Sequence, residues 1–96
     1  MALEALVLHP KDNVATAVLQ LESGRHISIK NSQISADIVL SKTIPSGHKF
    51  ALRNIEAGEK IIKYGEIIGQ ATTRIKEGEH VHIHNVEGLR GRGDRR

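Results

Sequence analysis

The chain has 96 residues, a formal net charge of +3, no cysteine, and only Phe50 and Tyr64 as aromatic residues. This length suits one domain with a modest aliphatic core, and a chain without cysteine has neither disulfides nor thiolate chemistry. Residues 1–89 carry ten Lys and Arg against ten Asp and Glu, so we expect no nucleic-acid partner, because such partners favour clustered cations and stacking aromatics.

Two predictions concern the ends of the chain. We expect residues 1–89 to form one domain and the basic stretch "RGRGDRR", residues 90–96, to be a disordered tail. The opening stretch "MALEALVLHPKD" has too short an apolar run for a signal peptide, and no other run approaches membrane-spanning length. The sequence therefore predicts a cytoplasmic protein without membrane contact.

The first predicted strand is "NVATAVLQ", residues 13–20. A helix is the alternative, since Val14, Val18 and Leu21 fall at helical spacing behind a possible cap at Asp12 or Asn13. We favour the strand because similar β-type residues, followed by the same kind of exit turn, recur in "HKFALRNIEAG", residues 48–58.

One local pattern recurs four times: an apolar residue, two variable residues, a glycine, and then apolar alternation. The copies are "LESGRHISI", "IPSGHKFAL", "IEAGEKIIK" and "IKEGEHVHI", which begin at residues 21, 44, 55 and 75. Each copy predicts a tight glycine turn that leads into a strand. Nine glycines also interrupt every window long enough for a helix. The sequence thus predicts a small, mainly β domain. The last two copies are offset by 20 residues, which could come from an internal duplication or equally from two packed hairpins.

The stretch "EGEHVHIHNV", residues 77–86, places three histidines in five positions: His80, His82 and His84. Alternate residues of a strand share a face, so we expect the imidazoles to point outward and the intervening apolar side chains inward. Neighbouring imidazoles then lie about 6.5 to 7 Å apart at their roots, close enough for two rings to hold one metal ion or an anion. The alternative is that the histidines only solvate the outer face of the strand.

Two further stretches place polar residues where a turn meets a strand. In "IPSGHKF", His48 and Lys49 follow the turn, where they could present a base and a cation. In "IIKYGEIIG", Lys63 and Tyr64 precede Gly65, which we expect to be a turn residue. The alternative is that both lysines are ordinary surface residues and that the tyrosine only packs.

The string "GHKFALRNIEAGEKIIKYGEIIGQATTRIKEGEHVHIHNV" resembles the SAF domain of the altronate and galactarate dehydratase family. That domain forms the N-terminal domain or a separate small subunit, and the small subunit of sulfolactate sulfo-lyase is similar. The motifs "GHK", "IKYG", "IG", "GEHVH" and "HN" occur in the family's order, and the likeness extends from His9 to about Leu89. The resemblance implies a β-clip fold.

The resemblance also implies a β-elimination, with loss of water from a sugar acid such as altronate or an aldarate. It implies a divalent metal, usually iron(II), with His82 and His84 as candidate ligands, although a large subunit could bind most of it. Carried over from the matching motifs, the implied catalytic residues are His48, Lys49, Lys63, Tyr64, His82, His84 and Asn85.

Complete enzymes of this family carry a large second domain with most of the catalytic apparatus. We therefore expect a small subunit that acts with a separate large subunit on a sugar-acid substrate and is inactive alone, where it could form a homo-oligomer. Two alternatives stay open: a sulfolactate sulfo-lyase small subunit, and a non-catalytic SAF module that binds carbohydrate or protein. An apolar patch near the histidines would favour a heteromeric enzyme.

Overall fold

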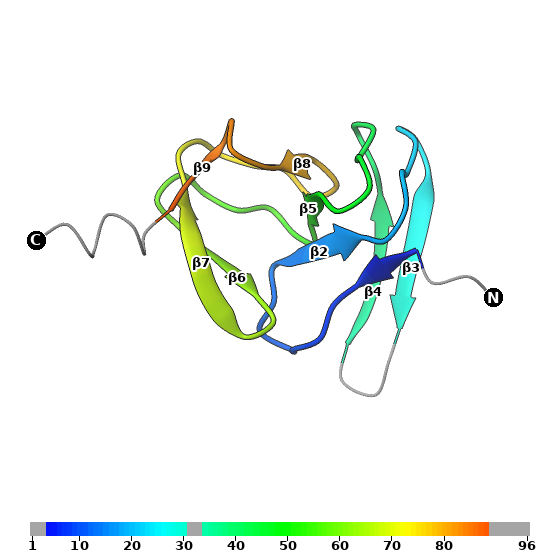
Figure 1. Ribbon diagram of the computed structural model, residues 1–96, viewed down its shortest axis with the longest axis horizontal. Helices are drawn as coiled ribbons and strands as arrows, with labels where there is room; N and C mark the ends of the chain where they lie inside the picture. The colour runs from blue at the N-terminus through cyan, green and yellow to red at the C-terminus, as the bar shows by residue number, and fades with distance from the viewer. Residues whose placement is uncertain (1–3, 31–33, 89–96) are drawn as a thin grey trace, which may run out of the picture.

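The computed structural model describes residues 4–30 and 34–88, and within these ranges the chain forms strands and turns but no helix (Figure 1). The predicted mainly β domain with short strands and tight glycine turns is confirmed. The described residues contain no helix long and apolar enough to cross a membrane. The predicted tail, residues 90–96, lies outside the described residues.

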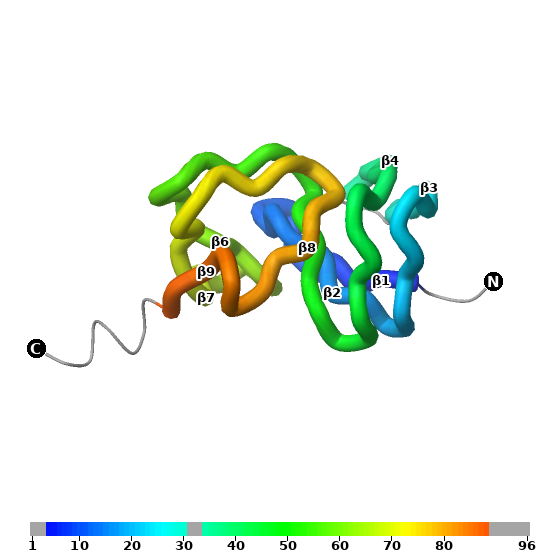
Figure 2. The backbone as a smooth tube through the Cα atoms, turned by 90° about the horizontal axis from the view of Figure 1, so that it is seen from above, coloured from blue at the N-terminus to red at the C-terminus, as the bar shows by residue number. Residues whose placement is uncertain are grey.

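The strands form three antiparallel sheets, in the orders β1-β2-β5-β8, β3-β4 and β6-β7-β9. The β3–β4 and β6–β7 hairpins stand on either side of the central strands β2 and β5 (Figures 1 and 2). The strand bounds are β1 Ala5–Leu6, β2 Val14–Ala17, β3 His26–Lys30, β4 Ser35–Val39, β5 Lys49–Ala51, β6 Lys60–Lys63, β7 Glu66–Ala71, β8 His80–Val81 and β9 Val86–Glu87.

The segment Val14–Ala17 is a strand, as predicted, and the helical alternative is wrong. Its residues pair with β5, where Ala15 lies opposite Phe50 and Thr16 lies opposite Lys49. Three of its four side chains are buried, so the segment is part of a sheet that is covered on both faces. Burial on both faces explains why the sequence of this strand lacks a clean alternation.

Two aliphatic cores lie on either side of β2 and β5. Phe50 is fully buried in the first core, to which the β3–β4 hairpin contributes Ile27 and Ile38. The second core joins β5 to the β6–β7 hairpin and includes Ile61 and Val81. Because each hairpin buries its apolar face against the same central strands, the strands that carry the site are held from both sides.

The four glycine turns of the repeated pattern face each other in two pairs. Leu21 and Ile44 exchange backbone hydrogen bonds of 2.9 and 2.8 Å, and Ile55 and Ile75 exchange bonds of 2.7 and 2.8 Å. The glycine three residues after each of these positions has a φ between 83° and 88°, the left-handed region that glycine adopts without strain. The chain therefore forms the same pair of hydrogen-bonded turns twice. The sequence pattern predicted the four turns but not how they pair.

Two buried polar side chains fasten the loop before β2 to the β6–β7 hairpin. Asn13 is fully buried; its Oδ1 accepts from the backbone N–H of Ile62 at 2.8 Å, and its Nδ2 donates to the carbonyl of Lys60 at 2.8 Å. Asp12 Oδ1 accepts from the N–H of Gly65 at 2.8 Å. These residues, which the sequence suggested as helix caps, instead satisfy the backbone of a distant hairpin.

Candidate functional site

Four histidines meet where β5 lies beside β8; we call His48, His80, His82 and His84 the histidine corner. Lys49 pairs with Val81 across these antiparallel strands, and this register sets the residue before β5 close to the residue after β8. Nδ1 of His48 lies 2.9 Å from Nε2 of His80, and the ring of His48 stacks on that of His82 with centroids 3.9 Å apart. The "GHK" and "HVHIH" motifs therefore form one site.

The chain runs through the histidine corner differently from the prediction. The strand ends at Val81, and residues 82–85 form a turn, so the expected continuous alternation is wrong beyond that point. Val81 is buried as predicted, but Ile83 is 84 % exposed instead of pointing into the core. The physical reason is Asn85, whose Oδ1 accepts from the N–H of His82 at 3.0 Å and whose Nδ2 donates to the carbonyl of His80 at 2.9 Å. An asparagine that bonds nearby backbone groups stabilises a turn in competition with a strand.

Asn85, a predicted catalytic residue, lies at the end of this turn. Its side chain is 6 % exposed and uses both its oxygen and its nitrogen to hold the turn. His80 belongs to the predicted histidine run but not to the predicted catalytic residues or metal ligands, although it lies at the centre of the corner. Its ring is 5.1 Å from that of His84 and 5.6 Å from that of His82. The signal that could have found it is the alternation of the histidines, combined with the pairing of β5 and β8.

The electrostatics of the corner favour neutral imidazoles at His80 and His82. Burial, and then the neighbouring imidazole of His48, lower the pKa of His80. The same two causes, with the Lys49 ammonium as a further contribution, lower the pKa of His82. A neutral imidazole has a lone pair that can accept a proton or bind a metal ion. The corner is therefore suited to general-base chemistry or to ligation.

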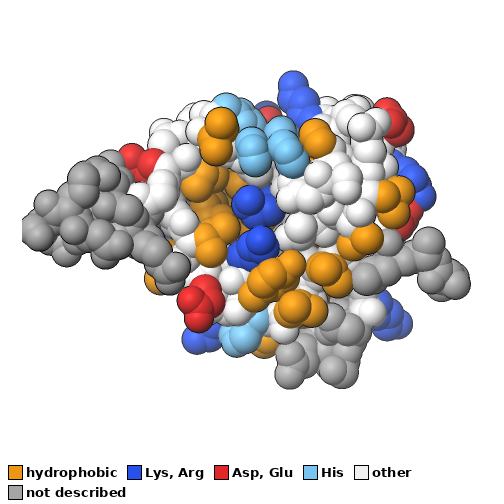
Figure 3. Space-filling model, in the orientation of Figure 1, with side chains coloured by type: hydrophobic (Ala, Val, Ile, Leu, Met, Phe, Trp, Pro, Cys, Tyr) orange, Lys and Arg blue, Asp and Glu red, His pale blue; other side chains and the backbone are white. Residues whose placement is uncertain are grey.

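Two lysines lie on the face beside the histidines. Lys49 is half-buried, and burial together with the positive charge of Lys63 lowers its pKa. Nζ of Lys63 lies 4.9 Å from the centre of the Tyr64 ring, a cation–π distance. In Figure 3, Lys or Arg side chains lie directly below the histidines, with hydrophobic side chains beside them. The structure thus brings the predicted residues of the "GHK" and "IKYG" motifs to one face.

Tyr64 holds an unusual backbone conformation. It and Gly65 connect β6 to β7 with φ values of 54° and 78°, the pattern of a type I′ hairpin turn, so Gly65 is a turn residue as predicted. A tyrosine at positive φ is strained, whereas asparagine or glycine fits there easily. Strain of this kind is tolerated where the surroundings fix it, and here Asp12 bonds the N–H of Gly65 and the ring of His9 packs over it.

Three residues fit a divalent metal in donor type and spacing. The ligand atoms of His48, His80 and His82 lie within 4.8 Å of one another, and imidazole nitrogen suits iron, zinc and related metals. This group includes His82 from the predicted pair, adds two histidines, and does not include His84. The ring planes are within 22° of parallel, so a shared ion would require at least one ring to rotate.

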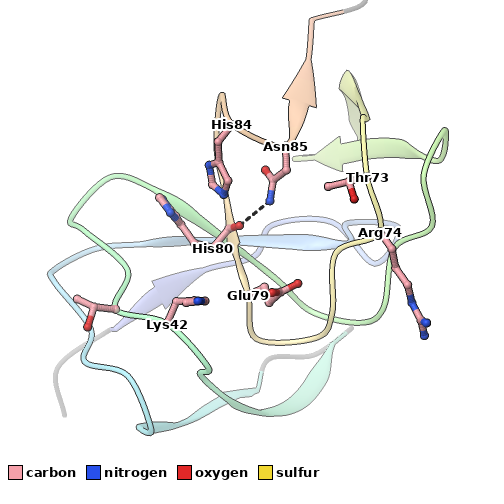
Figure 4. Close-up of a pocket in the computed structure, with 8 residues that line it drawn as sticks. Lys42, Thr73, Arg74, Glu79, His80, His84 and Asn85 are labelled. Carbon is pink, nitrogen blue, oxygen red and sulfur yellow. Dashed lines mark hydrogen bonds between the residues drawn. The ribbon is translucent and has the colours of Figure 1, made fainter.

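The other side of the corner opens into a hollow of about 520 Å³ that is lined by polar and charged residues. Figure 4 shows His80 and His84 on one side of this hollow and Thr73 on the other, with Lys42 and Glu79 also on its wall. His80 thus lies between this hollow and the face that carries the two lysines. The corner is open to solvent on both sides.

Comparison with known proteins gives consistent matches. Over 84 residues the chain is 40 % identical to altronate dehydratase of Escherichia coli strain K12, which covers 88 % of this chain and 16 % of that protein. Over 90 residues it is 32 % identical to (2R)-sulfolactate sulfo-lyase subunit alpha of Chromohalobacter salexigens, which covers 91 % of this chain and 96 % of that subunit. Over 76 residues it is 37 % identical to galactarate dehydratase (L-threo-forming) of Escherichia coli strain K12, covering 77 % of this chain and 13 % of that protein.

The chain spans about a sixth of the length of the altronate dehydratases that it matches. The relatives are named as dehydratases and as a subunit of a sulfo-lyase, which are lyases. The family model of the altronate/galactarate dehydratase SAF domain matches residues 3–89, which include every residue of the histidine corner and both lysines. The chain therefore belongs to the altronate/galactarate dehydratase SAF domain family.

Proposed function

We propose that this chain is the small subunit of a hydro-lyase that removes water from a sugar acid by β-elimination. Its histidine corner completes an active site with a separate large subunit. One observation carries the proposal: the "GHK" and "HVHIH" motifs converge at an open corner, where Nδ1 of His48 lies 2.9 Å from Nε2 of His80. Neutral imidazoles beside lysines are the groups that such an elimination requires.

The reaction breaks two bonds and forms one double bond. The C–H bond next to the carboxylate breaks, and its proton goes to a base. The electron pair forms a carbon–carbon double bond while the bond to the β-hydroxyl breaks, and this hydroxyl takes a proton and leaves as water. The resulting enol tautomerises to a 2-keto-3-deoxy acid. A general base and a general acid at suitable positions each accelerate such a step.

The described residues supply groups for each of these roles. His82 is a candidate base, because its lowered pKa keeps it neutral near pH 7. The hydrogen bond between His48 and His80 lets one proton be shared by two rings. Lys49 and Lys63 attract the carboxylate of the substrate. A divalent metal held by the three clustered histidines, such as the iron(II) that the family implies, would supply a Lewis acid that stabilises negative charge on the substrate carboxylate.

The surface around the corner supports a large partner. Ile83 is 84 % exposed and Ile67 is 57 % exposed. Ile83 also lines a hollow of about 230 Å³, together with His82, Ile68, Val86, Lys49 and Gly88. Exposed apolar side chains next to catalytic groups are typical of surfaces that another polypeptide covers. The relatives named altronate dehydratase are about six times longer than the region that they share with this chain. In this proposal the large subunit corresponds to the remainder of those proteins.

A second candidate is the small subunit of a sulfolactate sulfo-lyase. The observation that favours it is the extent of the match, because the aligned region covers 96 % of the sulfo-lyase subunit alpha. The elimination would follow the same course, with sulfite in place of hydroxide as the leaving group. A shorter match, 48 % identical over 44 residues, to the sulfo-lyase subunit alpha of Paracoccus pantotrophus also supports it. Over the longer alignments the identity to altronate dehydratase, 40 % over 84 residues, exceeds the 32 % over 90 residues to the sulfo-lyase subunit, which favours the dehydratase.

The test measures turnover with three preparations: this chain, the large lyase subunit of the same organism, and their mixture. Altronate, galactarate and sulfolactate are offered to each, and 2-keto-3-deoxy acid and sulfite are measured. We expect keto-acid formation by the mixture alone. Sulfite release from sulfolactate, without 2-keto-3-deoxy acid formation from altronate or galactarate, would establish the second candidate. Turnover by this chain alone would contradict the two-subunit proposal, and a mixture that forms a stable complex without any turnover would favour a non-catalytic binding module.

A further inference from the structure

The two lysines beside the histidine corner have no anionic partner in the part of the chain that the structure describes. Among residues 4–30 and 34–88, neither Lys49 nor Lys63 forms an ion pair. Lys63 contacts the Tyr64 ring, and Glu66, which lies opposite it across the hairpin, does not pair with it. Both lysines are partly buried. Two cations that approach each other in a partly desolvated place raise the energy of the ligand-free protein.

Each lysine lines a hollow, and the two hollows share one wall residue. Lys63 lines a hollow of about 300 Å³ together with Tyr64, Glu66 and Ile67, and Lys49 lines a hollow of about 230 Å³ together with His82. Ile68 is part of the wall of both hollows. A ligand that extends from one hollow into the other would therefore pass both ammonium groups and end beside the histidine corner.

We propose that Lys49 and Lys63 form a binding site for a hydroxy acid with two anionic groups, an aldarate or a sulfonated hydroxy acid, in preference to an acid with one. The inference rests on the proposed function, whose substrate class it narrows. Two anionic groups neutralise both cations, whereas a single carboxylate leaves one lysine unpaired beside a bound ligand. The free-energy cost of leaving one lysine unpaired lowers the affinity for an acid with one anionic group relative to an acid with two.

The apolar surroundings strengthen this discrimination. Lys49 lies beside the apolar side chains of Ile68 and Val86. Lys63 lies beside Ile67 and Ile68, and the carboxylate of Glu66 lines the same hollow without forming an ion pair with it. Charge–charge interactions are stronger near apolar groups that displace water. Closure by a large subunit would remove more water and increase the preference further. The chain alone should therefore show the preference at millimolar ligand concentrations, and the complex should show it more strongly.

The first measurement is a binding titration of the full chain, followed by NMR of its lysine side chains. The ligands are galactarate and gluconate, which have six carbons each but two carboxylates and one carboxylate, respectively. Sulfolactate and lactate form a second pair, in which the additional anionic group is a sulfonate instead of a carboxylate. We expect each dianionic acid to bind about tenfold more tightly than its partner, the gain from one charged hydrogen bond. Equal affinities within both pairs would overturn the proposal, as would inorganic sulfate that binds as tightly as either dianionic acid.

The variants test whether these lysines carry the preference. Lys49→Gln and Lys63→Gln should each abolish it, and Lys63→Gln should also stabilise the ligand-free chain because it removes a like charge. The matched control is Lys60→Gln, which lies on the same strand as Lys63 but pairs with Gln70 on the exposed face. The control should keep the full preference. A preference that survives in both site variants would contradict the assignment.

Turnover by the complex separates this inference from the proposed function. A dianion preference without any elimination would reject the lyase function and leave the binding site in place. Elimination with the same KM for galactarate and altronate, unchanged by Lys63→Gln, would reject the binding site and leave the lyase function in place.

Discussion

Nδ1 of His48 lies 2.9 Å from Nε2 of His80, although 32 positions separate the two residues in the chain. At this distance one imidazole donates a hydrogen bond and the other accepts it, so at least one of the two rings is neutral. The pairing of β5 with β8 produces this contact. Several consequences of the arrangement can be measured.

Metal affinity should follow the cluster in the structure and not the pair predicted from the sequence. We expect His48→Ala and His82→Ala to weaken cobalt(II) binding by roughly tenfold or more, because each removes one of the three grouped nitrogens. His84→Ala should have a smaller effect. Visible absorption during a cobalt(II) titration measures the affinity. The control is His26→Ala, on the exposed side of β3. A loss of cobalt(II) affinity in His84→Ala as large as that in His48→Ala would instead support His82 and His84 as the metal ligands.

The stability of the metal-free protein should fall as the pH is lowered from about 7 to about 5. Because burial and neighbouring imidazoles lower the pKa of His80 and His82, the unfolded chain binds more protons than the folded chain below the usual histidine pKa of about 6.5. The free energy of unfolding therefore decreases in this range. His80→Gln should reduce the slope of the free energy of unfolding against pH. Urea unfolding in a chelating buffer at several pH values measures this slope, and equal slopes for the parent protein and His80→Gln would contradict the explanation.

Asn13 should be essential for the β6–β7 hairpin. Asn13→Ala removes the partners of the Ile62 N–H and the Lys60 carbonyl in a fully buried place, so we expect the free energy of unfolding to fall by about 1 to 3 kcal/mol. Asn54→Ala is the control, because Asn54 also accepts a backbone hydrogen bond, from Glu77, but at an exposed position. Urea unfolding compares the two variants, and similar losses would show that burial does not set the cost.

The strained turn at Tyr64 should trade stability against function. Tyr64→Asn should raise the free energy of unfolding by about 0.5 to 1 kcal/mol, because asparagine tolerates positive φ and Asn-Gly suits a type I′ turn. The same change removes the aromatic contact to Lys63 and should lower turnover by the complex. Gly65→Ala should instead be destabilising, since its Cβ would lie 2.8 Å from the His9 ring at a φ of 78°. A Tyr64→Asn variant with unchanged stability and full activity would show that the conformation has no cost and no use.

The exposed apolar surface should decide assembly and not folding. Ile83→Glu should leave the free energy of unfolding within about 0.5 kcal/mol of the parent protein, because Ile83 is 84 % exposed. It should weaken association with the large subunit by at least roughly tenfold if the side chain is central to the interface. Val39→Glu, at a residue that is 60 % exposed on β4, is the matched control. Sedimentation of mixtures measures association, and equal weakening by both changes would place the interface elsewhere.

The sequence itself determined the class of fold and the location of its turns. Each glycine of the repeated pattern adopts the positive φ that only glycine reaches easily, and the alternation in β3 matches its alternating burial. These are local properties, because a φ preference and a side-chain period involve only neighbouring residues. The motifs also placed the chain in its family, which the match over residues 3–89 confirms.

Only the tertiary structure decided how the histidines lie. Within the run, His80 alone is in a strand, because Asn85 folds the following residues into a turn and leaves Ile83 in solvent. The partner of His80 is His48, and the register of β5 against β8 brings the two rings together. Such a register is set by burial on both sides of the sheet and by hydrogen bonds between segments that are distant in the sequence. A local sequence pattern contains neither kind of information. It could therefore identify the histidines as candidate site residues but not predict which residues lie next to them in space.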